Sequence, residues 1–206
     1  MAEKFEPLAS DVLRAPLFGS LISGLHIDNC RVILDLGSAR AATVDLFNRY
    51  SCRLDIADLS TGLDVLNSQK DPGLLREQVE SMFPACGQEA TDVVLCWDLL
   101  NYLQRPALTA VMERIASRAR RGTLVHALII YSSRRMPTIP RIYFPCKKPG
   151  DESGNFDHLT AIPVTIEECD APQYSPDYLK RCMQGYYIER AILLSNGMQE
   201  FLFRIS

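Results

Sequence analysis

Residues 31–43 have the sequence Arg31-Val-Ile-Leu-Asp-Leu-Gly-Ser-Ala-Arg-Ala-Ala-Thr43, which says more about the fold than any other segment. An apolar run ends at Asp35-Leu-Gly37 and passes directly into small residues with a helical pattern. A continuous apolar run is typical of a parallel strand that is buried on both faces. A tight turn that leads into a helix N-terminus is a common binding site for a nucleotide-like cofactor. The segment therefore predicts a strand, a turn and a helix at such a site, although glycine is sparse in the turn.

The composition is that of a globular protein, and we expect one domain over residues 1–206. Hydrophobic residues make up 47% and charged residues 23% of the 206, which are ordinary globular values. The net charge of −3 gives no general attraction to nucleic acid or an anionic membrane, and no apolar stretch reaches the ~18 residues of a membrane span. The first residues lack the order of a signal peptide. Seven cysteines without a Cys-x-x-Cys pair favour a reducing, cytoplasmic location and no metal site.

Strand and helix patterns alternate along the chain. Short apolar runs predict strands at 31–36, 52–57, 92–98 and 123–130. Apolar residues at helical spacing, with Pro and cap signals, predict helices at 9–25 (bent near Pro16), 41–50, 71–83, 106–120 and 175–184. This alternation predicts an α/β fold, with a mostly parallel, Rossmann-like sheet and helices on both of its faces.

The C-terminal region carries a separate signal. Two apolar runs, 186–194 and 198–205, flank Ser195-Asn-Gly197. Asn-Gly between apolar runs is the strongest short-range hairpin signal. We therefore expect the chain to end in an antiparallel β-hairpin.

This order of elements resembles the class I S-adenosylmethionine-dependent methyltransferases, whose seven-stranded sheet is parallel except for a last strand that returns by a hairpin. The resemblance covers roughly residues 10–130 and 175–206. The family's first motif is an acidic residue followed by Gly-x-Gly-x-Gly. Asp35 and Gly37 match it, and alanines stand in place of the two later glycines, at positions 39 and 41. The resemblance implies that S-adenosylmethionine is the cofactor and that Asp35, Gly37, Ser38 and Ala39 line its methionine end.

Two further motifs follow from the resemblance. The acid that binds the ribose corresponds to Asp58, 21 residues after Gly37, in line with the spacing of about 20 in Rossmann-type sites. Asp55 is the alternative. After the 92–98 strand, the resemblance places Asp98 and Asn101 in the cleft beside the reacting centre. Asp98 is thus a candidate both for cofactor binding and for catalysis. Trp97 and Tyr102 are expected to line the cleft. Asp35, Asp58 and Asp98 could instead only end a strand or cap a helix.

Two segments depart from the family pattern. Between Asp58 and Asp92 only one helix is predicted, so the edge strand that the family has there is expected to be missing; residues 62–66 are a poor match for it. Residues 131–174 form a long insertion that, by the resemblance, covers the active site. Its basic residues suggest an anionic substrate or partner, or else a solvated loop: Arg134, Arg135, Arg141, Lys147 and Lys148. His158, the only histidine in the insertion, is a candidate base.

The sequence thus favours an S-adenosylmethionine-dependent methyltransferase with an unidentified acceptor. The two alanines and the missing strand support an alternative, a catalytically inactive methyltransferase-fold protein that binds or regulates a partner. A nicotinamide-dependent oxidoreductase fits the strand–loop–acid pattern but not the hairpin.

Overall fold

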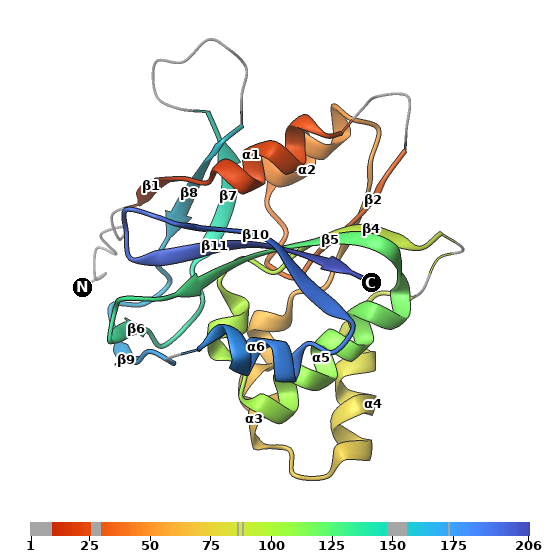
Figure 1. Ribbon diagram of the computed structural model, residues 1–206, viewed down its shortest axis with the longest axis vertical. Coiled ribbons are helices and arrows are strands. Elements are labelled where there is room, and N and C mark those ends of the chain that lie inside the picture. The colour runs from red at the N-terminus through yellow and green to blue at the C-terminus, as the bar shows by residue number, and fades with distance from the viewer. Residues whose placement is uncertain (1–9, 26–29, 86, 88, 148–155, 173) are drawn as a thin grey trace, which may run out of the picture.

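A six-stranded sheet forms the centre of the molecule (Figure 1). The computed structural model describes residues 10–25, 30–85, 87, 89–147, 156–172 and 174–206. The strands follow the order β10-β11-β5-β4-β2-β3. Their bounds are β2 Val32–Asp35, β3 Arg53–Ile56, β4 Thr91–Leu95, β5 Ala119–Ile130, β10 Tyr186–Leu193 and β11 Met198–Ile205. The first four are parallel to one another, as their sequence predicted.

The predicted C-terminal hairpin is confirmed. Strand β11 is antiparallel to both of its neighbours, β10 and β5. Leu194 N–H donates to the Met198 carbonyl at the turn, and Gly197 has a φ of 81°. A positive φ strains most residues but not glycine, so the turn position explains why glycine stands here.

Helices cover both faces of the sheet, and each face has its own hydrophobic core. Helices α1 (Pro16–Ser23) and α2 (Ala41–Asn48) lie on one face (Figure 1). The opposite face carries α3 Leu63–Ser68, α4 Pro72–Met82, α5 Arg105–Arg118 and α6 Pro176–Cys182. Successive strand residues point to opposite faces. Accordingly, Val125 and Ala127 of β5 join the α5 core, and Leu128 and Ile130 join the α1 core. None of the described helices has the length and apolar character needed to cross a bilayer.

The family's edge strand would lie next to β3. In the described sheet β3 itself forms that edge, and β10 forms the opposite one, which agrees with the expectation. Residues 59–68, which include the poor strand match, are helical: the 3-10 helix η1 Leu59–Gly62 leads directly into α3. The Asp71 side chain accepts a hydrogen bond from Leu74 N–H at 2.8 Å and begins α4. The chain therefore reaches β4 through two successive helices, α3 and α4, and the prediction of a single helix between Asp58 and Asp92 is wrong.

The prediction of one helix over 9–25 is wrong for its first part. Residues Asp11–Arg14 form strand β1, which pairs antiparallel with β8 (His158–Ile162). The helix begins only at Pro16, because proline lacks the N–H that a helix interior needs and fits the first helical position. Leu13 is buried as part of strand β1, and Leu17 is buried as part of helix α1. The helical spacing of these two leucines therefore spans two different elements.

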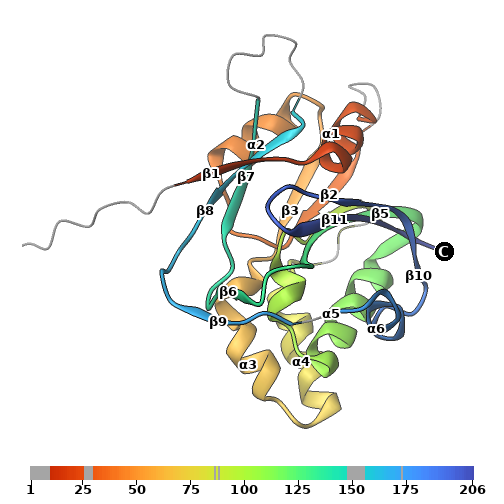
Figure 2. The same cartoon turned by 60° about the vertical axis from the view of Figure 1, so that its left-hand side comes forward.

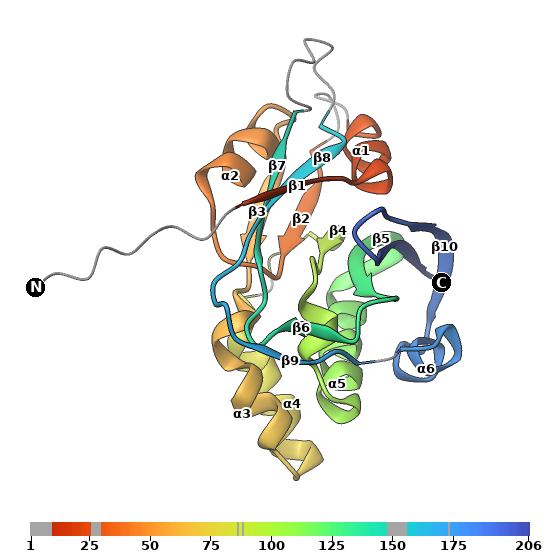
Figure 3. The same cartoon turned by 90° about the vertical axis from the view of Figure 1, so that its left-hand side faces the viewer.

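The insertion at 131–174 has more regular structure than a loop. Strands β7 (Ile142–Cys146), β8 and β1 form a small three-stranded sheet beside α2 (Figure 2). Strands β6 (Arg135–Pro137) and β9 (Glu168–Asp170) form a two-stranded ladder, and β9 leads on towards α6 (Figure 3). Lys148 lies outside the described residues. That the insertion acts as a lid stays a prediction.

Candidate functional site

Asp35, Asp58 and Asp98 lie at the carboxyl ends of β2, β3 and β4, three neighbouring strands. In open α/β sheets, ligands bind in the crevice outside this edge. Two cavities open there. The Trp97 crevice lies between Gly37, Ser38, Trp97, Asp98 and Tyr143. The Tyr102 pocket lies between Asp64, Asn67, Tyr102, Thr138 and Tyr174.

Trp97 occupies the space directly above the first motif. Its indole Nε1–H donates to the Asp35 carboxylate at 2.6 Å, and Gly37 N–H donates to the same oxygen at 2.9 Å. A Cβ atom on Gly37 would lie 2.8 Å from the Trp97 ring. Gly37 is thus required for the close approach of the indole, not only for a turn. Burial raises the pKa of Asp35 to about 6, against the opposing effect of these two hydrogen bonds.

The insertion closes the crevice from the other side. The ring of Tyr143 in β7 stacks on Trp97 with centroids 5.9 Å apart and an interplanar angle of 7°. Phe18 of α1 contacts the indole at 5.8 Å. Trp97 has a φ of 49°, a left-handed conformation that non-glycine residues adopt at a cost where their surroundings fix it. Tyr143 and Phe18 therefore hold Trp97 in this position together with the Asp35 hydrogen bond.

Asp98 is as deeply buried as Asp35, since each is 1% exposed. Its Oδ2 accepts from the Tyr143 hydroxyl at 3.2 Å and from Arg141 N–H at 3.3 Å, and its Oδ1 has no hydrogen-bond partner. Burial raises the pKa of Asp98 to about 7. The side chain does not cap the following 3-10 helix η2 (Leu99–Tyr102). Asp98 thus joins the end of β4 to β7 and has one buried oxygen without a hydrogen-bond partner.

Asp58 is engaged by neighbouring side chains. Its carboxylate accepts from the Ser38 hydroxyl at 2.8 Å and from Ser60 N–H at 3.1 Å, and also from the Ser60 hydroxyl. The structure therefore brings the predicted residues Ser38 and Asp58 together, while Ala39 is exposed. The alternative, Asp55, forms ion pairs with Arg53 at 3.3 Å and Arg118 at 3.5 Å. Asp55 is thus a structural partner for arginine, whereas Asp58 contacts Ser38 and Ser60, which line the crevice.

His158 lies away from both cavities, whereas Asn101 lines the Tyr102 pocket. His158 pairs with Asp157 at 2.7 Å and lines neither cavity. The Asn101 amide donates to the Asp98 and Leu128 carbonyls and accepts from Ile130 N–H, so it ties η2 to β5. These backbone partners leave the Asn101 amide little capacity to bind a ligand.

The sequence did not predict a buried His–Glu contact that lies behind the crevice. His126 Nε2 lies 2.8 Å from Glu200 Oε1, and both side chains are fully buried. The Glu200 carboxylate also accepts from Leu17 and Phe18 N–H, the first turn of α1. The His126 ring packs against both Phe18 and Trp97. An acidic residue in an apolar strand was the only available signal, because its partners lie far away in the sequence.

The space in the Trp97 crevice determines whether S-adenosylmethionine fits there. The acids that the resemblance requires are present, but the space is not: the cavity is about 240 Å³, below the range of about 300–1,000 Å³ that is usual for ligand pockets. The resemblance places the methionine end beside Gly37, where the indole lies, and the Asp35 and Asp58 carboxylates already have partners. In this arrangement the crevice does not fit the cofactor.

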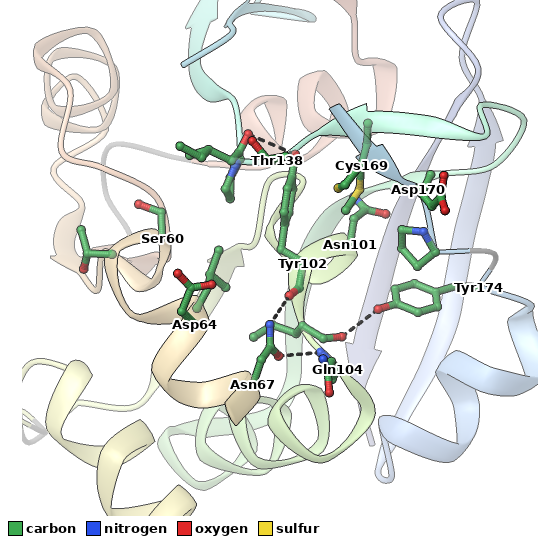
Figure 4. Close-up of a pocket in the computed structure, with 18 residues that line it drawn as sticks. Ser60, Asp64, Asn67, Asn101, Tyr102, Gln104, Thr138, Cys169, Asp170 and Tyr174 are labelled. Atoms are coloured by element: carbon green, nitrogen blue, oxygen red, sulfur yellow. Dashed lines mark hydrogen bonds between the residues drawn. The ribbon is translucent and has the colours of Figure 1, made fainter. Parts of the chain in front are cut away.

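The Tyr102 pocket is larger, about 440 Å³. Figure 4 shows it between η1–α3 on one side and the β9–Tyr174 segment on the other. Hydrogen bonds fix its walls: Asn67 bridges the Tyr102 carbonyl and Gln104 N–H, and the Tyr174 hydroxyl donates to the Leu103 carbonyl at 2.7 Å. The pocket is thus built on side chains with little freedom to move.

Among the residues that the structure describes, no group of three His, Cys, Asp or Glu is placed to hold a metal ion.

Comparison with known proteins supports the fold. No protein-family model matches the sequence, and a search of curated proteins finds no match. Among solved structures, the glycopeptide N-methyltransferase MtfA complexed with S-adenosylhomocysteine is 12% identical; the match covers 93% of this chain and 88% of MtfA, with a TM-score of 0.51. MtfA has also been solved with S-adenosylmethionine and with sinefungin.

Two other solved structures are similar at lower scores. An S-adenosylmethionine-dependent methyltransferase from Clostridium acetobutylicum is 12% identical, with 93% and 89% of the two chains covered and a TM-score of 0.49. The 1,6-didemethyltoxoflavin-N1-methyltransferase of Burkholderia thailandensis is 14% identical, with 91% and 76% covered and a TM-score of 0.48. Together with the strand order, the MtfA likeness shows that this chain has the class I methyltransferase fold.

Proposed function

We propose that the chain is an S-adenosylmethionine-dependent methyltransferase that acts on an unidentified acceptor. The observation that supports this most is the convergence of Asp35, Asp58 and Asp98 at the carboxyl ends of β2, β3 and β4, beside two adjoining cavities. Asp58, with Ser38 and Ser60, is the group that we expect to hold the ribose. A cytoplasmic location and the identity of any protein partner stay predictions.

Cofactor binding requires a change in the crevice. Trp97 and Tyr143 have to leave the space above Gly37 before a methionine group can enter. Because the crevice does not fit the cofactor in this arrangement, no catalytic step is assigned to any residue here.

The filled crevice favours a second candidate, a catalytically inactive protein that uses this fold to bind or regulate a partner. Its support is specific: Trp97 donates to Asp35 and stacks on Tyr143, and Ser38 donates to Asp58. An inactive protein could retain this packing permanently, whereas an enzyme has to open it.

Calorimetric titration with S-adenosylhomocysteine separates the two candidates. The methyltransferase proposal expects binding at micromolar concentration that is lost in Asp58→Ala. Asp45→Ala is the matched control, because Asp45 is an exposed acid on α2. Absence of heat at millimolar ligand would reject the methyltransferase and leave the inactive candidate. Binding that Asp58→Ala leaves unchanged would reject the assigned role of Asp58.

A further inference from the structure

The Tyr102 pocket has the size and the fixed walls of a ligand site. Its volume of about 440 Å³ lies within the usual range of about 300–1,000 Å³. The side chains of Asn67, Tyr102 and Tyr174 are held by backbone hydrogen bonds at 2.7–3.2 Å, some of which are drawn in Figure 4. Because these walls are already ordered, a ligand that enters does not have to order them, and this favours binding.

The lining of the pocket combines apolar surface with a few polar groups. Leu63, Met136 and Pro140 contribute apolar surface. Asp64, in the first turn of α3, is exposed and has no hydrogen-bond or ion-pair partner among the described residues, and neither has the side-chain amide of Gln104. This is the composition of a site that encloses an apolar body and orients it by a small number of polar contacts.

The charged side chains of the lining are acidic. Its described residues include two carboxylates, Asp64 and Asp170, and no lysine or arginine. Arg135 pairs with Asp170 and Glu168, so of the two lining carboxylates only Asp64 is without a cationic partner, and Arg141 lines the Trp97 crevice. The sequence suggested an anionic substrate from these basic residues, but their positions do not create a basic surface in the pocket.

We propose that the Tyr102 pocket binds a small organic molecule that has an apolar body and is uncharged or cationic, and that it discriminates against anions. The pocket shares Ser60, Ile139 and Pro140 with the Trp97 crevice, so the two cavities adjoin. If the chain is a methyltransferase, such a molecule is the class of its methyl acceptor. That assignment rests on the proposed function, whereas binding to the pocket does not.

Three probes with the same phenol–ethyl skeleton test the charge preference: tyramine, which is cationic, 4-ethylphenol, which is neutral, and 3-(4-hydroxyphenyl)propanoate, which is anionic. Saturation-transfer NMR on the full chain, without any S-adenosyl compound, measures their binding at millimolar concentration. We expect tyramine and 4-ethylphenol to bind, and the carboxylate to bind at least about tenfold more weakly, because like charges are brought together. Equal or tighter binding of the carboxylate, or binding of no probe, would overturn the proposal.

Two variant pairs locate the binding. Thr138→Phe fills the pocket from an exposed position and should abolish binding, whereas Ile166→Phe, an exposed position outside both cavities, should not. Asp64→Lys should weaken tyramine binding about tenfold, and Glu77→Lys on the exposed face of α4 should leave it unchanged. Binding that survives Thr138→Phe would place the probes elsewhere and reject the site. Because these readouts need no S-adenosylhomocysteine, their failure is distinguishable from failure of the proposed function.

Discussion

The Trp97 crevice and the Tyr102 pocket lie side by side at the end of β4, yet they differ in what fills them. The crevice contains large apolar side chains, since Trp97 is 4% exposed and is stacked on Tyr143. In the pocket, the polar side chains of Asn67 and Tyr174 are held by backbone groups, and the space between them is open. The difference shows that the location of a site in this fold and its openness are separate properties. Each of the following substitutions tests either the packing of the Trp97 crevice or the openness of the Tyr102 pocket.

Trp97→Ala should have the largest effect. Removal of a buried Trp side chain typically costs about 3–5 kcal/mol, so the free energy of unfolding, measured by urea denaturation with circular dichroism, should fall by that amount. Leu193→Ala, at a position that is 59% exposed, is the control and should change little. A loss below about 1 kcal/mol would mean that the crevice is not packed as described.

Asp98→Asn should alter the pH dependence of stability. The folded pKa of about 7 lies above the ordinary value of 3.8, so the folded state holds this proton more tightly than the unfolded state, and stability is lost as pH rises between these two values. Relative to the variant, the wild type should lose on the order of 1–4 kcal/mol between about pH 4 and about pH 8. Denaturation curves across this range measure the difference. A difference that does not vary with pH would show that Asp98 is not buried as an acid.

Tyr143→Phe should have a smaller effect, because it removes one hydrogen bond to Asp98 and keeps the stacked ring. The expected cost is about 0.5–1.5 kcal/mol. Trp97 is the only tryptophan, so its fluorescence reports on the crevice: acrylamide quenching should stay low in Tyr143→Phe and rise in Tyr143→Ala. Tyr131→Ala, at an exposed position, should leave quenching unchanged. Similar quenching in all three variants would argue against Tyr143 as the cover.

Thr138→Phe should have the smallest effect on stability, within about 0.5 kcal/mol, as for most surface positions. It should nevertheless remove probe binding in the Tyr102 pocket. Thermal unfolding and the NMR titration, performed on the same sample, measure the two quantities. A large loss of stability would mean that Thr138 is part of a packed wall and not of an open pocket.

The fold was largely predictable, because its signals are local. The Asp71-Pro72 helix start, the Asn196-Gly197 turn and the apolar run at 32–34 each specify their element within a few residues. Strand β1 was missed because its partner, β8, is far away in the sequence and the spacing of Leu13 and Leu17 imitates a helix. The strands of the insertion were missed for the same reason: their pairing is not local.

The position of the candidate site was predictable from the sequence, but the packing of side chains within its two cavities was not. The sequence by itself determined the parallel sheet, the terminal hairpin and the edge at which Asp35, Asp58 and Asp98 converge. These features depend on strand periodicity and on turn residues, both of which involve residues that are close together in the sequence. Only the tertiary structure decided that Trp97 and Tyr143 fill one cavity, that Asp58 is bound by Ser38, and that the neighbouring pocket is open and without basic residues. These properties depend on which side chains from distant segments meet and on how much space their packing leaves.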